Sequence, residues 1–400
     1  AWADAGPTRQ RVPVMKVAMI DPSLFTPRYD DGLCEAVAAR GHEVTLLGRP
    51  MRETDAIVPK RYQYVARFFR LGERLRPLLG EGRVGQAVKA LDYALDARLG
   101  SLAAMDGDVA HFQWLPFAMA DAALVRRLRG RSALVHTVHN ARPYHGDSKA
   151  AQARGYEALL AQFDALIVHG EQTRDVLLAQ GHDAERIHIV PHPPMKLRDA
   201  TPADLVAVPR PAVPRILIFG TIRPYKGLDL LVQACLTLWR DGLEFELAIA
   251  GKPFMPVEPF VGAIHGGGFG DRLITDFGFL TEHRLDAHLR AAEILAFPYR
   301  AIDSSGAFLS ALRYGAAMVT SDAGMFGELP DGVASRFPAG NAAALTVALR
   351  QLLSDARRRK EAGDAAQAYG TALAGWDKAA QQTEAAYEAA RQAFMARVAA

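Results

Sequence analysis

The sequence predicts an α/β protein built from two doubly wound, Rossmann-like domains that face each other across a cleft. Its 400 residues, half of them hydrophobic, are too many for one comfortable core and suit two domains of similar size. Short apolar runs alternate with helical segments in both halves, which is typical of parallel sheets covered by helices. A proline-rich segment separates the two series and predicts the boundary between the domains.

The first domain is expected at residues 15–197. From Met15, MKVAMIDPS is an apolar run closed by turn residues, GLCEAVAARG is a helix that ends at Gly41, and HEVTLLG is the next run. These segments form a β-α-β unit, and comparable runs follow at DVAHFQW, SALVHTVHN and ALIVHG. Residues 1–14 show no apolar period, so we expect a disordered extension that takes no part in the fold.

The second half of the chain begins after the prolines. Six prolines lie between residues 193 and 214, so we expect no regular structure there and place the linker at 198–214. The runs RILIFG, EFELAIAG, ITDFGF, ILAFPY and AAMVTSD predict a second parallel sheet in a domain over 215–375. Residues 376–400 are rich in alanine and predict a helix that packs back across a domain surface.

Charge and composition exclude several classes of protein. The formal charge of +3 is small for this length, and Lys and Arg are spread along the chain, which argues against nucleic-acid binding. Cys34 and Cys235 are too few for a disulfide framework or a Cys-based zinc site and suit a reducing compartment. No run approaches the roughly 20 apolar residues that cross a bilayer, and no signal-peptide pattern is present. We therefore expect a cytoplasmic protein, soluble or peripheral on the cytoplasmic membrane.

The segment FGTIRPYKG, residues 219–227, carries the clearest chemical pattern. It follows an apolar strand and leads into the helix LDLLVQACLTLW, so the helix start offers free N–H groups. Gly220 and Gly227 permit close backbone approach, and Arg223 and Lys226 add two cations. This loop predicts a diphosphate-binding site, although an ordinary strand-to-helix loop with solvated charges is the alternative.

Together with FGTIRPYKG, the segments HFQWLP, TVHNARPY and PYRAIDSSGAFLSALRYG resemble family 4 type glycosyltransferases of the GT-B architecture. Among these the chain is similar to bacterial exopolysaccharide glycosyltransferases such as the mannosyltransferase of xanthan assembly. The resemblance covers nearly the whole chain from Met15. It implies transfer of a hexose, mannose or glucose, from a GDP- or UDP-linked donor to a glycan or polyprenyl-linked acceptor in polysaccharide biosynthesis.

The resemblance also implies a donor site in the second domain. Arg223 and Lys226 would neutralise the leaving pyrophosphate without a metal or another cofactor, Lys252 could add a third contact, and Phe279 would lie against the nucleobase. The donor-binding residues implied in this way are Gly220, Thr221, Arg223, Lys226, Lys252, Phe279, Asp303, Ser304, Ser305 and Gly306. Asp303 could instead cap the helix that follows. Ser310 stands where relatives place a second carboxylate, so ribose binding through that group is not predicted.

Catalytic and acceptor-binding candidates of the first domain lie at strand ends. His139 resembles the family residue that contacts the donor sugar, and its imidazole could alternatively take the acceptor's proton. In the loop before the first helix, Asp30 or Asp31 could supply a base, with one capping the helix and the other facing the acceptor. The acceptor-binding candidates are Tyr29, Asp30, Trp114 and Asn140. If the anomeric configuration is retained, the departing phosphate could itself take the proton.

Three further features of the sequence concern metal binding, membrane contact and catalytic activity. The histidines of EHRLDAH are five positions apart, which does not match zinc pairing on a helix, and we predict no metal. The basic and apolar stretch from Lys60 to Leu102 could rest on anionic lipid at the inner face of the membrane, or form an ordinary solvated helical face. A catalytically inactive nucleotide-sugar or glycan-binding scaffold is the alternative to an enzyme, because the carboxylate at Ser310 is missing.

Overall fold

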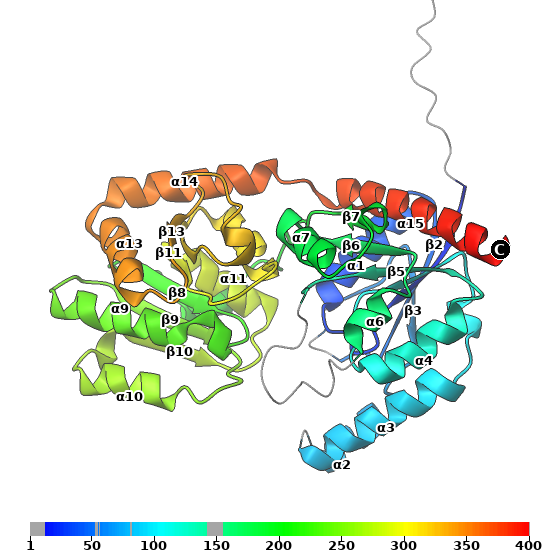
Figure 1. Ribbon diagram of the computed structural model, residues 1–400. Helices are drawn as coiled ribbons and strands as arrows, with labels where there is room; N and C mark the ends of the chain where they lie inside the picture. The colour runs from blue at the N-terminus through cyan, green and yellow to red at the C-terminus, as the bar shows by residue number, and fades with distance from the viewer. Residues whose placement is uncertain (1–12, 53–54, 56, 81, 142–154, 400) are drawn as a thin grey trace, which may run out of the picture.

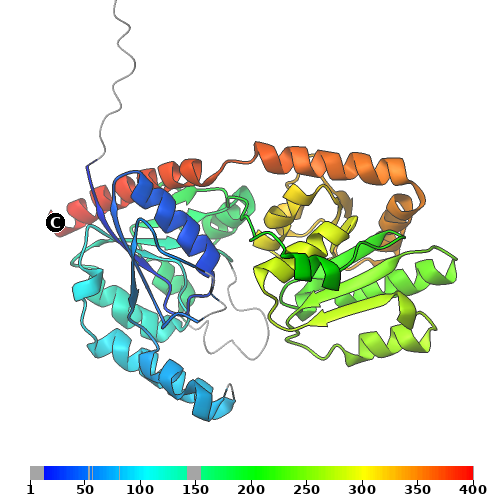
Figure 2. The same cartoon turned by 180° about the vertical axis from the view of Figure 1, so that it is seen from behind.

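The computed structural model describes residues 13–52, 55, 57–80, 82–141 and 155–399. Most of the predicted extension at 1–14, and the end of the TVHNARPY segment, lie outside the described residues. Two α/β domains lie side by side, and the chain passes between them twice (Figures 1 and 2). The predicted fold class is confirmed.

The first domain contains, within the described residues, a parallel seven-stranded sheet in the order β3-β2-β1-β4-β5-β6-β7. Its strands are β1 (Lys16–Ile20), β2 (Glu43–Gly48), β3 (Gln63–Ala66), β4 (Val109–Phe112), β5 (Ala133–Thr137), β6 (Ala165–Val168) and β7 (Ile187–Ile189). Its helices are α1 (Pro27–Ala39), α2 (Arg70–Leu79), α3 (Arg83–Leu99), α4 (Ala118–Leu128), α6 (Tyr156–Leu160) and α7 (Glu171–Ala179).

Both faces of this sheet are buried, as the apolar runs predict. Ala18 and Ile20 of β1 enter the core cluster that contains side chains of α3, α4, α6 and α7. Val17 and Met19 point to the opposite face and enter a second cluster that contains side chains of α1. Because successive side chains of a strand alternate between faces, one strand contributes to both cores.

The second domain contains a parallel sheet of six described strands in the order β10-β9-β8-β11-β12-β13. These strands are β8 (Arg215–Phe219), β9 (Glu246–Gly251), β10 (Leu273–Phe277), β11 (Ile294–Phe297), β12 (Ala317–Ser321) and β13 (Ser335–Phe337). The helices around them are α9 (Leu228–Arg240), α10 (Glu258–Gly266), α11 (Glu282–Ala291), α12 (Gly306–Ala311), α13 (Ala342–Ser354) and α14 (Ala356–Ala372). Here too β8 is divided between two cores, with Ile216 and Ile218 on one face and Leu217 and Phe219 on the other.

The linker contains a short helix, α8 (Pro202–Ala207), so the prediction that it has no regular structure was wrong. The Thr201 hydroxyl accepts a hydrogen bond from the Asp204 backbone N–H at 3.2 Å, and the Asp204 carboxylate accepts from the Thr201 N–H at 3.2 Å. This reciprocal capping satisfies the helix start. Pro202 occupies the first turn, where a missing N–H costs nothing, so this proline begins a helix instead of preventing one.

The last helix, α15 (Trp376–Ala399), returns to the first domain and covers one face of its sheet (Figure 1). Ala380, Thr383 and Tyr387 are almost fully buried there. The Tyr387 hydroxyl lies 2.8 Å from His111 Nδ1 on β4, and α15 shares a core cluster with α1. Within the described part of the chain, no helix is both long and apolar enough to cross a membrane.

Candidate functional site

Lys226 lies near the end of the predicted phosphate loop, which joins β8 to α9, and its side chain points back toward the end of β8. Its Nζ donates a hydrogen bond to the Phe219 carbonyl oxygen at 3.0 Å, and only 5% of the residue is exposed. Gly220 has φ +88°, and a Cβ there would lie 3.2 Å from Lys226 Nζ. A glycine is therefore favoured at this position because it adopts the left-handed conformation and leaves room for the ammonium group.

The charge on Lys226 is not balanced by the protein. No carboxylate within the described residues forms an ion pair with Lys226 or with the neighbouring Arg223. Burial, together with the Arg223 guanidinium, lowers the pKa of Lys226 to about 8. A buried cation without a negatively charged partner is energetically costly, so the loop provides a site at which an anion would be stabilised.

Two exposed aromatic rings adjoin the loop at the carboxyl ends of β9 and β10. The Arg223 guanidinium lies 4.4 Å from the Phe254 ring centre, and Phe254 packs edge-on against Phe279 with 6.4 Å between ring centres. Lys252 Nζ lies 5.6 Å from the Phe279 ring centre. The predicted residues Arg223, Lys252 and Phe279 are thus brought together. The sequence analysis did not predict Phe254 as a site residue. Its position directly after AGKP, at the end of a predicted strand, is the sequence signal that could have indicated this role.

The segment DSSG, residues 303–306, lies between the domains. The Asp303 carboxylate accepts a hydrogen bond from the Ala141 backbone N–H of the first domain. Asp303 does not cap α12, as we considered, because the Ser305 hydroxyl accepts from the Phe308 N–H at 3.2 Å and fills that role. A Cβ on Gly306 would lie 3.0 Å from Met195, which shows that this glycine packs against the segment leading to the linker.

Three hydroxyl side chains of the predicted donor segments differ in their surroundings; they are Thr221, Ser304 and Ser310. Thr221 is exposed in the phosphate loop, and Ser304 is partly exposed. The Ser310 hydroxyl donates to the Gly306 carbonyl at 2.7 Å inside α12. Ser310 therefore completes a hydrogen bond within its own helix and does not replace the missing carboxylate.

His139 stands at the carboxyl end of β5 with both ring nitrogens engaged. Its Nε2 lies 3.0 Å from Gln113 Oε1, and its Nδ1 lies 3.1 Å from His169 Nε2. The His139 ring stacks on Trp114, with 4.8 Å between ring centres and 9° between planes. Burial, followed by the charges of neighbouring histidines, lowers the pKa of His139 well below its ordinary value. His139 is therefore a neutral, fixed imidazole with no free nitrogen for an acceptor proton.

Tyr29 and Asp30 do not face the cleft, so their prediction as acceptor contacts was wrong. Tyr29 is 2% exposed and packs against His139, His169 and Trp376. Asp30 is fully buried, and burial together with the nearby Asp21 carboxylate raises its pKa well above the ordinary value. A fully buried carboxyl group cannot reach the acceptor in the cleft and so cannot act as its base.

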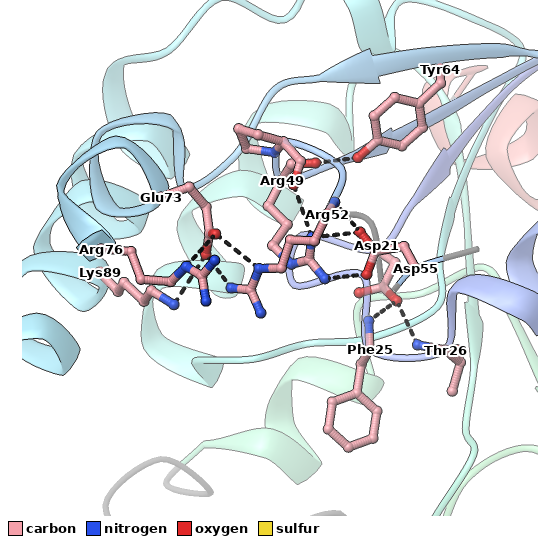
Figure 3. Close-up of polar contacts among 11 residues, drawn as sticks. Asp21, Phe25, Thr26, Arg49, Arg52, Asp55, Tyr64, Glu73, Arg76 and Lys89 are labelled. Carbon is pink, nitrogen blue, oxygen red and sulfur yellow. Dashed lines mark hydrogen bonds and ion pairs between the residues drawn. The ribbon is translucent and has the colours of Figure 1, made fainter. Parts of the chain in front are cut away.

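Asp31 is also placed differently from the prediction. Its Oδ1 accepts a hydrogen bond from the Tyr62 hydroxyl at 2.8 Å, on the side of α1 away from His139. Neither Asp30 nor Asp31 caps α1, because the helix begins at Pro27 with Thr26 before it. The turn ahead of that helix is held by Asp21, which accepts from the Phe25 and Thr26 N–H groups at 2.5 and 3.2 Å (Figure 3).

An aromatic cavity of about 660 Å³ opens beside His139 at the ends of β4 and β5. Trp114 and Asn140, both predicted as acceptor contacts, line it together with His139. The apolar part of its wall comes from Phe25, Phe69, Leu115, Pro116, Phe117 and Tyr156. Aromatic walls with a few polar groups are typical of sites for small organic ligands.

The two domains meet through polar contacts close to these sites. Besides the Asp303–Ala141 hydrogen bond, Arg28 forms an ion pair with Glu282 at 2.7 Å. The Gln172 N–H donates to Glu328 Oε1 at 2.8 Å. Over the described ranges, no group of His, Cys, Asp and Glu side chains is arranged to hold a metal ion, and independence from metal stays a prediction.

Two facing parallel-sheet domains, with a cationic loop after the first strand of the second, define the GT-B architecture. Residues 28–193 match the family described as Glycosyltransferase Family 4, and residues 213–355 match Glycosyl transferases group 1. The chain therefore contains a glycosyltransferase family 4 domain followed by a group 1 domain. A specific relation to the enzyme of xanthan assembly stays a prediction.

Curated relatives carry the names of glycosyltransferases. The chain is 32% identical over 185 residues to a D-inositol 3-phosphate glycosyltransferase of Xylanimonas cellulosilytica, covering 41% of this chain and 44% of that protein. It is 32% identical over 183 residues to an MMP alpha-(1->4)-mannosyltransferase of Mycolicibacterium hassiacum, covering 44% of this chain and 42% of that protein. The matched region thus spans less than half the length of either relative.

The fold is similar to that of Anabaena HepE, solved in complex with UDP and glucose. The TM-score is 0.68 at 16% sequence identity, and the alignment covers 92% of this chain and 98% of HepE. At this identity the likeness concerns the arrangement of the two domains.

Proposed function

We propose that this chain transfers a hexose, mannose or glucose, from a GDP- or UDP-linked donor to a glycan or lipid-linked oligosaccharide in polysaccharide biosynthesis. The observation that carries the proposal is the buried ammonium of Lys226, which lies beside Arg223 without an ion-pair partner in the described chain. A nucleoside diphosphate supplies the missing negative charge. The family 4 and group 1 domains support a transferase, and the UDP and glucose named for HepE support a sugar nucleotide as donor.

The donor site would work by fixed electrostatics. As the glycosidic bond breaks, negative charge develops on the departing diphosphate, and Arg223 and Lys226 are already positioned against it. The exposed rings of Phe254 and Phe279 offer faces for the nucleobase, and Lys252 lies next to them. We propose that these groups replace the metal ion that other transferases use.

The acceptor would bind in the aromatic cavity, where Trp114 and Asn140 lie next to His139. Neither Asp30, which is buried, nor His139, whose nitrogens are engaged, is available as a base. This arrangement favours transfer of the acceptor's proton to the departing phosphate, the route that retains the anomeric configuration. His139 then acts by positioning Trp114 and the donor sugar.

A peripheral contact with the inner face of a membrane is the second part of the proposal. Helices α2 and α3 form a hairpin at the edge of the first domain (Figure 1). Exposed apolar side chains of this hairpin are Leu71, Leu78, Val84, Leu91, Leu95 and Leu99. Arginines lie among them, which suits an anionic lipid surface and a polyprenyl-linked acceptor.

Calorimetric titration with UDP, GDP and ADP in the presence of EDTA tests the donor site. We expect one nucleotide to bind, and Lys226→Met to weaken it about 10- to 100-fold, because a charged contact is lost. Lys378→Met, which removes an exposed lysine of α15, is the matched control. Equal affinity of both variants for every nucleotide would contradict the proposal. Hydrolysis of the matching sugar nucleotide then distinguishes an enzyme from an inactive scaffold.

A further inference from the structure

A second cation-rich cavity, of about 870 Å³, lies in the first domain beside α2. We call it the arginine cavity. The arginines that line it are Arg49, Arg52, Arg70, Arg74 and Arg76, and its carboxylates are Asp55 and Glu73. We propose that the arginine cavity binds a phosphate group carried by the acceptor. The assignment of this phosphate to the acceptor rests on the proposed function, whereas the binding of phosphate in the cavity is independent of it.

Glu73 is the centre of the charge arrangement (Figure 3). Its carboxylate forms a bidentate pair with Arg52, is 3.0 Å from Lys89 Nζ and is 3.5 Å from Arg76 Nε. Burial alone would raise the pKa of Glu73, but hydrogen bonds from Arg52 and Lys89 lower it to about 2. The single negative charge of Glu73 is therefore shared by three cations, so this group of side chains carries an excess of positive charge.

The other charges of the cavity do not remove this excess. Arg49 and Asp55 form a bidentate pair at 2.6 and 2.8 Å and neutralise each other (Figure 3). Arg70 and Arg74 lie on the exposed side of α2, and neither forms an ion pair with any described carboxylate. Guanidinium groups bind phosphate oxygens in pairs, so several of them around one cavity are suited to a phosphate or diphosphate.

The arginine cavity adjoins the aromatic cavity in which we place the acceptor sugar. Phe25 lines both cavities, and Lys89 lines the aromatic cavity while its partner Glu73 lines the arginine cavity. Phe279 of the second domain also lines the arginine cavity, so a ligand there would lie at the junction of the domains. A phosphate in this position would be attached to the acceptor and distinct from the donor phosphates at Lys226.

Calorimetric titration with inorganic pyrophosphate tests the site. The Lys226→Met variant is used as the background, because it weakens the donor loop and isolates the arginine cavity. In this background we expect pyrophosphate to bind, and Arg70→Ser with Arg74→Ser to weaken it at least about tenfold. The matched control is Arg83→Ser with Arg98→Ser, which removes the same charge from exposed positions of α3 outside the cavity.

Two results overturn the proposal: no pyrophosphate binding in the Lys226→Met background, or equal affinity when Arg70 and Arg74 are changed. Absence of nucleotide binding to the wild-type protein would instead refute the donor site, and the wild-type titration tests this separately. Circular dichroism of each double variant confirms that α2 and α3 remain folded.

The source of the phosphate is identified with two further probes, glucose 6-phosphate and phosphatidylcholine vesicles containing phosphatidylglycerol. Selective weakening of glucose 6-phosphate binding by the Arg70 and Arg74 changes indicates a soluble sugar phosphate. The same selectivity toward vesicles indicates a phosphate on a lipid. If both pairs of substitutions weaken both probes equally, the cause is general surface charge, and the phosphate site is refuted.

Discussion

The carboxylate of Asp303, in the second domain, accepts a hydrogen bond from the backbone N–H of Ala141, in the first. Ala141 follows His139 and Asn140 at the mouth of the aromatic cavity. One hydrogen bond therefore links the loop after β11 with the loop after β5, and it joins the two walls on which donor and acceptor would lie.

Replacing Asp303 with alanine should loosen this junction. A hydrogen bond to a charged group contributes about 1.5–3 kcal/mol, so we expect amide exchange at Ala141 to rise at least about tenfold. Exchange measured by mass spectrometry over the peptide that contains Ala141 provides the test. Asp322→Ala is the matched control, because Asp322 accepts a comparable 2.8 Å bond from the Ala339 N–H inside one domain. Unchanged exchange at Ala141 would show that this bond does not hold the domains together.

Nucleotide binding should depend on the protonation of Lys226. In the free protein its pKa is lowered to about 8, and a bound diphosphate would raise it, because the opposite charge favours the ammonium form. Affinity should therefore be full below about pH 8 and fall as the pH rises through 8 to 9.5. Lys226→Arg keeps its charge over this range, so its affinity should stay constant. Parallel titrations of the two proteins that give the same slope would refute this assignment.

Loss of the Ser305 cap should destabilise the second domain. Ser305→Ala leaves the Phe308 N–H without its hydroxyl partner and is expected to cost about 1 kcal/mol. Urea unfolding followed by the fluorescence of Trp239, which lies in the core of that domain, measures the change. Ser304→Ala, at a neighbouring position that makes no capping bond, should leave the midpoint within experimental error.

Glu384 should anchor α15 to the first domain. Its carboxylate is almost buried and accepts from Arg40 Nε at 2.7 Å, with His42 Nε2 at 2.9 Å. Glu384→Ala is expected to lower the stability of this domain by about 1.5–3 kcal/mol, because charged hydrogen bonds are lost. Urea unfolding in a background with Trp2→Phe and Trp239→Phe, where Trp114 and Trp376 report on the first domain, provides the measurement. Glu388→Ala, one turn further along α15, should have little effect.

The parts of the fold and of the site that are formed by residues close together in the chain could be predicted from the sequence. Alternating apolar runs and helices predict the two sheets, because local periodicity largely determines a parallel α/β fold. Within the loop FGTIRPYKG, Gly220 and Lys226 are six positions apart and come together in a single turn of chain. The phosphate-binding part of the proposed donor site is therefore contained in one sequence segment.

Contacts between residues that lie far apart in the chain could not be predicted from the sequence. Tyr29 follows a strand end, like a ligand contact, but Trp376 and His192 come from far along the chain and bury it. The Asp303–Ala141 bond and the cations around Glu73 likewise join separate parts of the sequence. The packing of Phe254 against Arg223 and Phe279 likewise depends on the order in which β8, β9 and β10 lie in the sheet.

The return of α15 to the first domain has a consequence for synthesis of the chain. Core residues of α15 complete a cluster whose other members come mainly from α1 and from strands β1, β2, β4, β5 and β6 of the first domain; these residues are Ala379, Ala380, Ala386, Tyr387 and Ala390. During synthesis, the second domain has all of its described strands and α14 before α15 is made, but one sheet face of the first domain stays only partly covered until α15 emerges. The domain that is translated first should therefore be the last to reach its native core.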